Sequence, residues 1–140
     1  PQGCDCKDPD VWKNLPDYSY VNDWTPESPL LIPEAQGGAF DPWGGTGYQD
    51  CAKLTGTDFT RVFSKMNIAA GFSGQSFYMT YGGTNWGWLA DPNAVYTSYD
   101  YGAPINKSRQ LTDKYQEFKR LGYMVNSVTS LARTDKAQAP

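Results

Sequence analysis

The stretch Leu30-Leu31-Ile32-Pro33-Glu34-Ala35-Gln36-Gly37-Gly38-Ala39-Phe40-Asp41-Pro42-Trp43-Gly44-Gly45 decides the fold class of this 140-residue chain. A short apolar run, residues 30–33, ends in a single glutamate, and a loop of glycine and aromatic residues follows at once. Pro33 cannot donate to a sheet, so we expect it to be the last position of a strand. The pattern predicts that Glu34 lies at the tip of that strand and faces a loop whose glycines allow close approach of a ligand.

Similar elements recur along the rest of the chain. Apolar residues at roughly helical spacing predict a helix over residues 51–66, which Gly56 interrupts or bends. Residues 75–81 predict a second strand, and another loop of glycine and aromatic residues follows it. A final helix with Thr112 as its N-cap is predicted from one apolar face. That face consists of Leu111, Tyr115, Phe118, Leu121, Val125 and Val128.

The order strand, loop, helix, strand, loop, helix predicts a loop-rich α/β fold with parallel strands and right-handed crossovers. In such folds the loops after the carboxyl ends of the strands carry the chemistry, and both elaborate loops of this chain follow predicted strands. Two parallel strands do not make a stable sheet by themselves, and a closed (β/α)₈ barrel needs about 250 residues. We therefore expect either a quarter of such a barrel or a piece of some other larger sheet.

Composition and charge exclude several classes of function. The net charge is −3 and no basic stripe occurs, which argues against nucleic-acid binding. No apolar run approaches the roughly 20 residues of a membrane span, so we expect no membrane partner. The chain has no histidine, the commonest metal ligand and the commonest general base, so we expect no metal and no cofactor.

The three cysteines, Cys4, Cys6 and Cys51, leave two interpretations open. Cys4 and Cys6 are too close in sequence to bridge each other without strain, so one of them could pair with Cys51. A link from Cys6 to Cys51 would enclose the Glu34 loop and stabilise the fold by about 4 kcal/mol in the loop-entropy treatment. The other interpretation is three free thiols in a reducing compartment.

Glu34 is the best candidate for a catalytic group. Of the three glutamates, Glu27 lies among prolines and serine and Glu117 lies beside basic residues on the final helix, so we expect both to be solvated. The alternative for Glu34 is a surface acid at a strand end. If Glu34 acts on a glycosidic bond, a second carboxyl group is normally needed as well. The loop aspartates are expected to cap turns; they are Asp41, Asp50 and Asp100.

Aromatic side chains of the two loops could line one pocket if both strand ends face the same way. The C–H faces of a sugar stack on such rings, and tyrosine hydroxyls hydrogen bond to a carboxylate or to sugar hydroxyls. The alternative is that the rings form the core of a loop-rich protein. The rings are Phe40, Trp43, Tyr78, Trp86, Trp88 and Tyr101.

Three motifs in this order resemble those of the fungal secreted β-galactosidases of glycoside hydrolase family 35. They are Pro33-Glu34-Ala35-Gln36-Gly37-Gly38-Ala39-Phe40-Asp41-Pro42-Trp43-Gly44-Gly45, Tyr78-Met79-Thr80-Tyr81-Gly82-Gly83-Thr84-Asn85-Trp86-Gly87 and Tyr96-Thr97-Ser98-Tyr99-Asp100-Tyr101-Gly102. The resemblance covers nearly the whole chain. It implies the C-terminal segment of a (β/α)₈ TIM barrel, with about two β/α units that include the last strands. Residues 1–131 are then part of a catalytic barrel domain, and residues 132–140 are a linker or tail.

The resemblance also implies roles for individual residues. Glu34 matches the catalytic nucleophile. Tyr78 and Tyr101 match tyrosines that line the galactose site, and Trp43 and Trp86 are expected to contribute to substrate binding.

The resemblance also bears on a disulfide beside the nucleophile loop, on two positions that depart from the family and on the cellular compartment of the protein. Cys6 and Cys51 match a disulfide pair that braces this loop. Ala35 stands where these enzymes usually carry an aromatic residue, and Cys4 stands where an apolar residue is expected. Asn106 opens a glycosylation acceptor sequence, which fits secretion.

The function that the resemblance implies is part of a retaining β-galactosidase that hydrolyses terminal β-galactosides by double displacement. The acid/base glutamate of these enzymes stands in an Asn-Glu pair on an earlier strand, and this chain has no such pair. We therefore expect the 140-residue chain alone to be inactive. Its expected partners are a β-galactoside, the rest of the barrel and the downstream β domains. The alternatives are a non-catalytic galactoside-binding module and a fragment without a function of its own.

Overall fold

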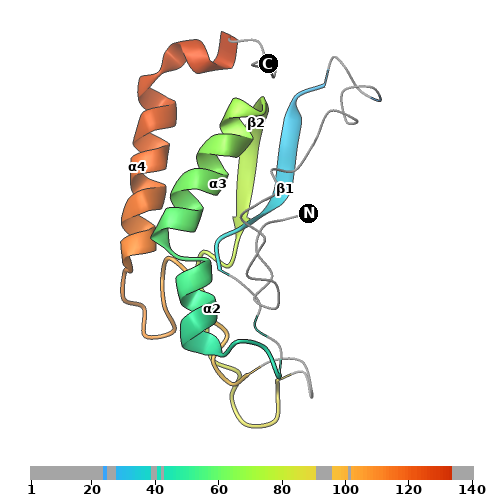
Figure 1. Cartoon of the computed structure of the whole chain (residues 1–140), viewed down its shortest axis with the longest axis vertical. Helices are drawn as coiled ribbons and strands as arrows, with labels where there is room; N and C mark the ends of the chain where they lie inside the picture. Colours follow the sequence, from blue (N-terminus) through green and yellow to red (C-terminus); the bar gives the residue numbers. More distant parts are fainter. Residues whose placement is uncertain are drawn as a thin grey trace.

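The computed structural model describes Trp24, Asp41 and residues 28–38, 43–90, 96–100 and 102–133. This part of the chain contains two strands and three α-helices, and the two long helices lie side by side along the strands (Figure 1). The elements are β1 (Leu30–Gln36), α2 (Tyr48–Leu54), α3 (Thr57–Ala69), β2 (Phe72–Tyr78), α4 (Asp113–Ser127) and the short 3₁₀ helix η2 (Thr129–Arg133). This arrangement confirms the predicted α/β class.

The two strands form a parallel pair, as predicted. β1 continues beyond Pro33 to Gln36, so the prediction that the strand ends at the proline is wrong. The register shifts between Ile32 and Ala35, and this irregularity contains the proline, which has no N–H to give to the ladder. Within the described ranges each strand has one neighbour, so the sheet has two strands and two open edges there.

The core lies between the sheet and α3. Phe59 and Phe63 stack with ring centroids 5.2 Å apart, and they pack against buried residues of both strands. Because side chains alternate across a strand, the neighbours of the buried Ala35 point away from this core. The strand members of the core are Leu30, Ile32, Ala35 and Phe72, with Leu54 and Phe77 at its margin.

The helices begin and end close to the predicted positions. Gly56 separates α2 from α3, which confirms the predicted interruption. α3 runs to Ala69 and β2 begins at Phe72, so the second strand starts three residues before the predicted position 75. No helix in the described ranges is both long enough and apolar enough to span a bilayer.

The N-terminus of α4 is as predicted, but its buried face is not. Thr112 precedes the helix, and its hydroxyl donates to the carbonyls of Ala103 and Pro104 at 3.3 and 3.0 Å instead of capping the helix. The residues of α4 that are buried are Lys114, Glu117 and Leu121. Of the predicted apolar face, only Leu121 is fully buried.

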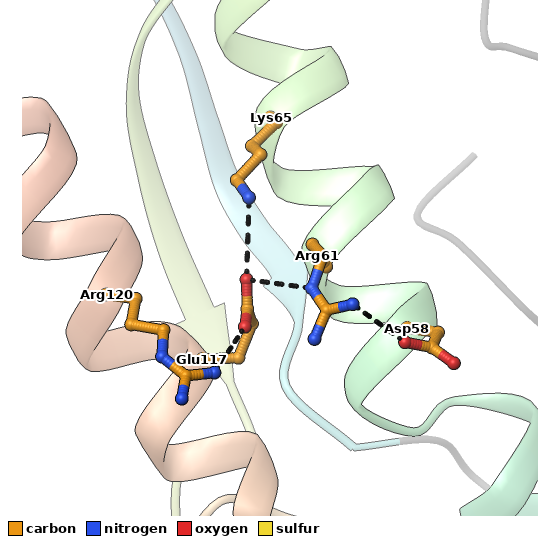
Figure 2. Close-up of polar contacts among 5 residues, drawn as sticks. All are labelled: Asp58, Arg61, Lys65, Glu117 and Arg120. Atoms are coloured by element: carbon orange, nitrogen blue, oxygen red, sulfur yellow. Dashed lines mark hydrogen bonds and ion pairs between the residues drawn. The ribbon is translucent and has the colours of Figure 1, made fainter.

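Glu117 joins α4 to α3, and the expectation that it is solvated is wrong. Its side chain is 3% exposed and its carboxylate contacts three cations from the two helices (Figure 2). Arg61 and Lys65 of α3 approach it at 3.4 and 3.5 Å, and Arg120 of α4 approaches it at 3.3 Å. Burial raises the pKa of Glu117, but the hydrogen bond from Arg120 and the charges of Arg61 and Lys65 outweigh burial, so the pKa lies below its ordinary value.

Candidate active site at the carboxyl ends of the strands

Glu34 lies near the carboxyl end of β1, on the face of the sheet that points away from the core. Its side chain is exposed. Tyr78 is the last residue of β2 and pairs with Gln36, two positions beyond Glu34. The hydrogen bond to Tyr99 and burial are the main causes that raise the pKa of Tyr78, and the charge of Glu34 is the smallest, so the Glu34 carboxylate lies within electrostatic range of the Tyr78 hydroxyl. The structure thus brings together two of the predicted site residues.

A second tyrosine completes this part of the site. The hydroxyls of Tyr78 and Tyr99 lie 2.5 Å apart, and either can be the donor. This hydrogen bond is the main cause that raises the pKa of Tyr78 to about 12, followed by burial and by the charges of Tyr99 and Glu34. Tyr78 therefore stays protonated at neutral pH, and its O–H can donate to a carboxylate or to a sugar hydroxyl when Tyr99 is the donor of the hydrogen bond between the two tyrosines.

Two loops that are apart in the sequence pair with each other and place Tyr99. The N–H of Tyr99 donates to the carbonyl of Gly83 at 2.9 Å, and the N–H of Asn85 donates to the carbonyl of Thr97 at 2.7 Å. The backbones approach so closely that a Cβ on Gly82 would lie 2.1 Å from the carbonyl oxygen of Tyr99. A side chain at position 82 is therefore excluded, which gives a physical reason for glycine in this loop.

Gly37, just after β1, is held from two sides. Its N–H donates to the carbonyl of Tyr78 at 2.7 Å, and its own carbonyl accepts a hydrogen bond from the ammonium of Lys114 at 2.8 Å. Lys114 is 4% exposed, and burial lowers its pKa to about 7. A Cβ on Gly37 would lie 2.5 Å from the carbonyl oxygen of Tyr78, so the ends of the two strands are in backbone contact at this point.

The residue that follows Tyr78 has a strained backbone. Met79 is 7% exposed and adopts φ 63°, a left-handed conformation that is unusual for a bulky side chain. Such strain costs of the order of 1–3 kcal/mol and persists where the surroundings fix it. The close contact of Gly37 with the backbone of Tyr78 and Met79 provides that constraint.

The predicted tryptophans lie on the surface of the described chain. Trp43 is 62% exposed and stacks on Tyr96 with ring centroids 6.0 Å apart. Trp86 is 75% exposed. Tyr101 and Phe40 lie outside the described residues. A role of these rings in binding a sugar stays a prediction.

Asp100 organises a loop, as expected from its place beside tyrosine and glycine. Asp100 is 2% exposed, and its carboxylate accepts hydrogen bonds from the hydroxyl of Tyr48 and from the N–H of Lys107, the latter at 3.0 Å. The N–H of Gly102 donates to the same carboxylate at 3.4 Å. These contacts agree with a structural role.

Cys51 is buried in α2 and is disulfide-bonded. Cys4 and Cys6 lie outside the described residues, so the assignment of Cys6 as its partner stays a prediction. Asn106 accepts hydrogen bonds from the N–H groups of Ser108 and Gln110, at 2.9 and 3.0 Å, and so forms a compact turn. Its glycosylation also stays a prediction.

Two residues of the site were not identified from the sequence. Tyr99 lies within the third motif, so the motif itself was a signal that could have found it. Lys114 carries no such signal, because a lysine in the first turn of an amphipathic helix is usually solvated. Only the tertiary structure places its ammonium next to a backbone carbonyl at the end of β1.

A carboxylate and a tyrosine at the carboxyl ends of parallel strands are typical of the sites of α/β enzymes. The model of the glycosyl hydrolases family 35 matches residues 2–125, and the chain belongs to this family.

The chain is also similar to three curated fungal proteins. It is 51% identical over 132 residues to "Probable beta-galactosidase A" of Emericella nidulans, and the matched region covers 91% of this chain and 13% of that protein. It is 47% identical over 127 residues to "Beta-galactosidase A" of Penicillium sp, and the matched region covers 87% of this chain and 12% of that protein. It is 41% identical over 137 residues to "Probable beta-galactosidase C" of Talaromyces marneffei, with coverages of 96% and 14%. The chain thus spans 12–14% of the length of these relatives.

Proposed function

We propose that this chain is part of a retaining β-galactosidase and that Glu34 is its nucleophile. The observation that carries the proposal is the place of Glu34 at the carboxyl end of a parallel strand, beside Tyr78, in a chain that belongs to glycosyl hydrolases family 35. The names of the relatives supply the substrate class, a β-galactoside.

The proposed reaction is a double displacement. The ionised carboxylate of Glu34 attacks the anomeric carbon, and the bond from that carbon to the glycosidic oxygen breaks. A second glutamate, outside this chain, protonates the leaving oxygen and later takes a proton from the water that attacks the galactosyl-enzyme ester. Galactose is released with retained configuration, and the carboxylate of Glu34 is regenerated. Tyr78 supports this reaction by donating its O–H to the nucleophile or to a sugar hydroxyl.

We further propose that residues 1–131 contribute the last two β/α units of a (β/α)₈ barrel. An open cavity of about 1400 Å³ between α3, β2 and α4 supports this proposal. Side chains from the predicted apolar face of α4 line it, and β2 offers an open edge within the described ranges. A surface of this kind fits the remaining strands and helices of the barrel. The cavity lining includes Tyr115, Phe118, Leu121, Val125 and Val128.

We also propose secretion, a Cys6–Cys51 disulfide and glycosylation of Asn106. The buried, disulfide-bonded state of Cys51 supports an oxidising compartment. Mass spectrometry of the protein from a fungal culture medium, with and without reduction, tests the three together. Peptides that link Cys4 to Cys51, or an unmodified Asn106, would refute the respective assignments.

The nucleophile is tested in a chimaera in which this chain replaces the segment that it matches in the Penicillium sp relative. A 2-fluoro-galactoside should inactivate the chimaera and label Glu34, which peptide mass spectrometry identifies. Glu34→Ala should lose hydrolysis, and added azide should restore turnover with an activated galactoside, because azide replaces the missing nucleophile. Glu117→Gln is the matched control, since this glutamate belongs to the ion cluster between the helices, and it should remain active. Label on another residue would overturn the assignment of Glu34.

The chain without its partner domains is predicted to be inactive, because it lacks the acid/base glutamate, whose proton transfer is typically worth 10²–10⁴-fold. Activity of the chain alone near that of the chimaera would refute this prediction. Specific galactose binding without hydrolysis in the chain alone would favour the galactoside-binding module. A broad or absent thermal transition would favour a fragment that needs the rest of the barrel.

A further inference from the structure

We propose that Lys114 is a positioning residue for Glu34, through the hydrogen bond that its side chain donates to the carbonyl of Gly37. This inference rests on the proposed function of Glu34 as nucleophile. It gives a role to a buried cation that lies outside the residues expected to face the sugar.

The burial of Lys114 is the first observation. The residue is 4% exposed, although it belongs to the first turn of a helix, where a lysine could easily reach water. Lysine is almost never fully buried without a partner, because its ammonium loses hydration. The partner of Lys114 is a backbone oxygen 77 residues away in the sequence, at 2.8 Å. This buried hydrogen bond connects α4 to the end of β1, although burial of the lysine costs hydration free energy.

The second observation is the contact that Gly37 makes on its other side. Its N–H donates to the carbonyl of Tyr78 at 2.7 Å, and the space for a Cβ is filled by that same carbonyl. Gly37 is therefore fixed relative to the end of β2 by its N–H and relative to α4 by its carbonyl. The segment from Glu34 to Gly37 is short, so this anchoring also restricts the backbone that carries the carboxylate.

A nucleophile needs such restriction. A displacement of about 1 Å away from the reactive geometry can reduce the rate by about 100-fold. Both the ammonium and the neutral amine of lysine carry N–H donors, so the tie to Gly37 does not depend on the protonation state of Lys114. The burial that lowers the pKa of this lysine to about 7 agrees with a structural tie of this kind.

The experiment compares two variants in the chimaera that carries this chain in the Penicillium sp relative. Lys114→Met keeps the length of the apolar stem and removes the donor, whereas Glu117→Gln changes the next buried polar residue of the same helix, which faces α3 instead of the site. The measured quantities are the rate constant of inactivation by the 2-fluoro-galactoside, kcat and KM for an activated galactoside, and Tm. The inactivation step reports the attack by Glu34 directly.

For Lys114→Met we expect the inactivation rate constant and kcat to fall about 10- to 100-fold, with KM changed less than about threefold. For Glu117→Gln we expect a lower Tm and an inactivation rate constant within about twofold of the parent. Where the methionine variant does not fold, Lys114→Gln replaces it, because its side chain is one atom shorter and does not reach the carbonyl. A methionine or glutamine variant that reacts within about twofold of the parent would overturn the proposal, as would equal losses in the Lys114 and Glu117 variants. If the parent chimaera itself is labelled elsewhere than Glu34, the proposed function fails instead, so the two failures are distinct.

Discussion

The hydroxyl of Tyr78, at the end of β2, lies 2.5 Å from the hydroxyl of Tyr99. Tyr99 belongs to loop 96–100, which pairs with loop 82–85. This short hydrogen bond connects two motifs that are separated in the sequence, and it does so beside Glu34. The site is therefore a product of three segments, β1, β2 and the loop that carries Tyr99.

Tyr99→Phe should lower the pKa of Tyr78 from about 12 toward its ordinary value of 10, because the hydrogen bond to Tyr99 is the largest cause of the shift. An ultraviolet difference titration against Tyr78→Phe isolates this one tyrosine among the ten in the chain. A titration of Tyr78 that is the same with and without the Tyr99 hydroxyl would contradict the hydrogen bond as the cause of the raised pKa.

Gly37→Ala should disturb the site, whereas Gly122→Ala should not. A Cβ at Gly37 would meet the backbone oxygen of Tyr78 at 2.5 Å, so the ends of the strands must separate. We expect a loss of stability of about 2–4 kcal/mol, within the range of strained or overpacked sites. Gly122 lies in α4 with open space around it, so alanine there should stabilise the fold by about 0.5–1 kcal/mol.

Urea denaturation of the two glycine variants beside the parent chain provides the measurement. Equal effects of the two substitutions would show that the contact between Gly37 and Tyr78 does not constrain the strand ends.

The sequence predicted the framework of this fold because local patterns determine it. The apolar run before Glu34, the helical spacing after Gly56 and the cap position Thr112 are all short-range signals, and each marks an element that the structure contains. The end of β1 was missed because an irregularity in the register, which no local pattern shows, lets the strand pass Pro33.

The tertiary contacts of the site could not be predicted in the same way. The burial of Lys114 and Glu117 depends on which face of α4 turns toward α3 and β1, and the apolar stripe suggested a different face. That stripe lines the open cavity, so its partner is absent from the described ranges. The position of Tyr99 beside Tyr78 depends on a pairing between two irregular loops, where periodicity carries no information.

Glu117→Gln should destabilise the chain by about 1–2 kcal/mol at neutral pH, because three cations lose their shared carboxylate but can rehydrate at the surface. The pKa of Glu117 lies below its ordinary value of 4.5, so this stabilisation is present above that value and is lost as the pH falls through the lowered pKa. Urea denaturation of parent and variant at neutral and acidic pH should therefore show a difference that shrinks on acidification. A difference that stays constant down to the acid limit would argue against an ionised Glu117.

Lys114 should make the stability of the chain depend on pH in the neutral to alkaline range, above the acidic range in which Glu117 titrates. Its pKa is about 7 in the folded chain and 10.5 in its ordinary state, so the unfolded chain binds more protons between these values and stability rises with pH there. Below pH 7 the lysine is charged in both states, and the cost of its burial is fully present. The difference in unfolding free energy between the parent and Lys114→Met should thus increase by about 1.4 kcal/mol per pH unit above the folded pKa. Urea titrations of both chains in steps from about pH 6 to about pH 9.5 measure this slope, because the other titrating groups are common to both and cancel. A flat difference for Lys114→Met would contradict the lowered pKa and would mean that its ammonium stays hydrated in the folded chain.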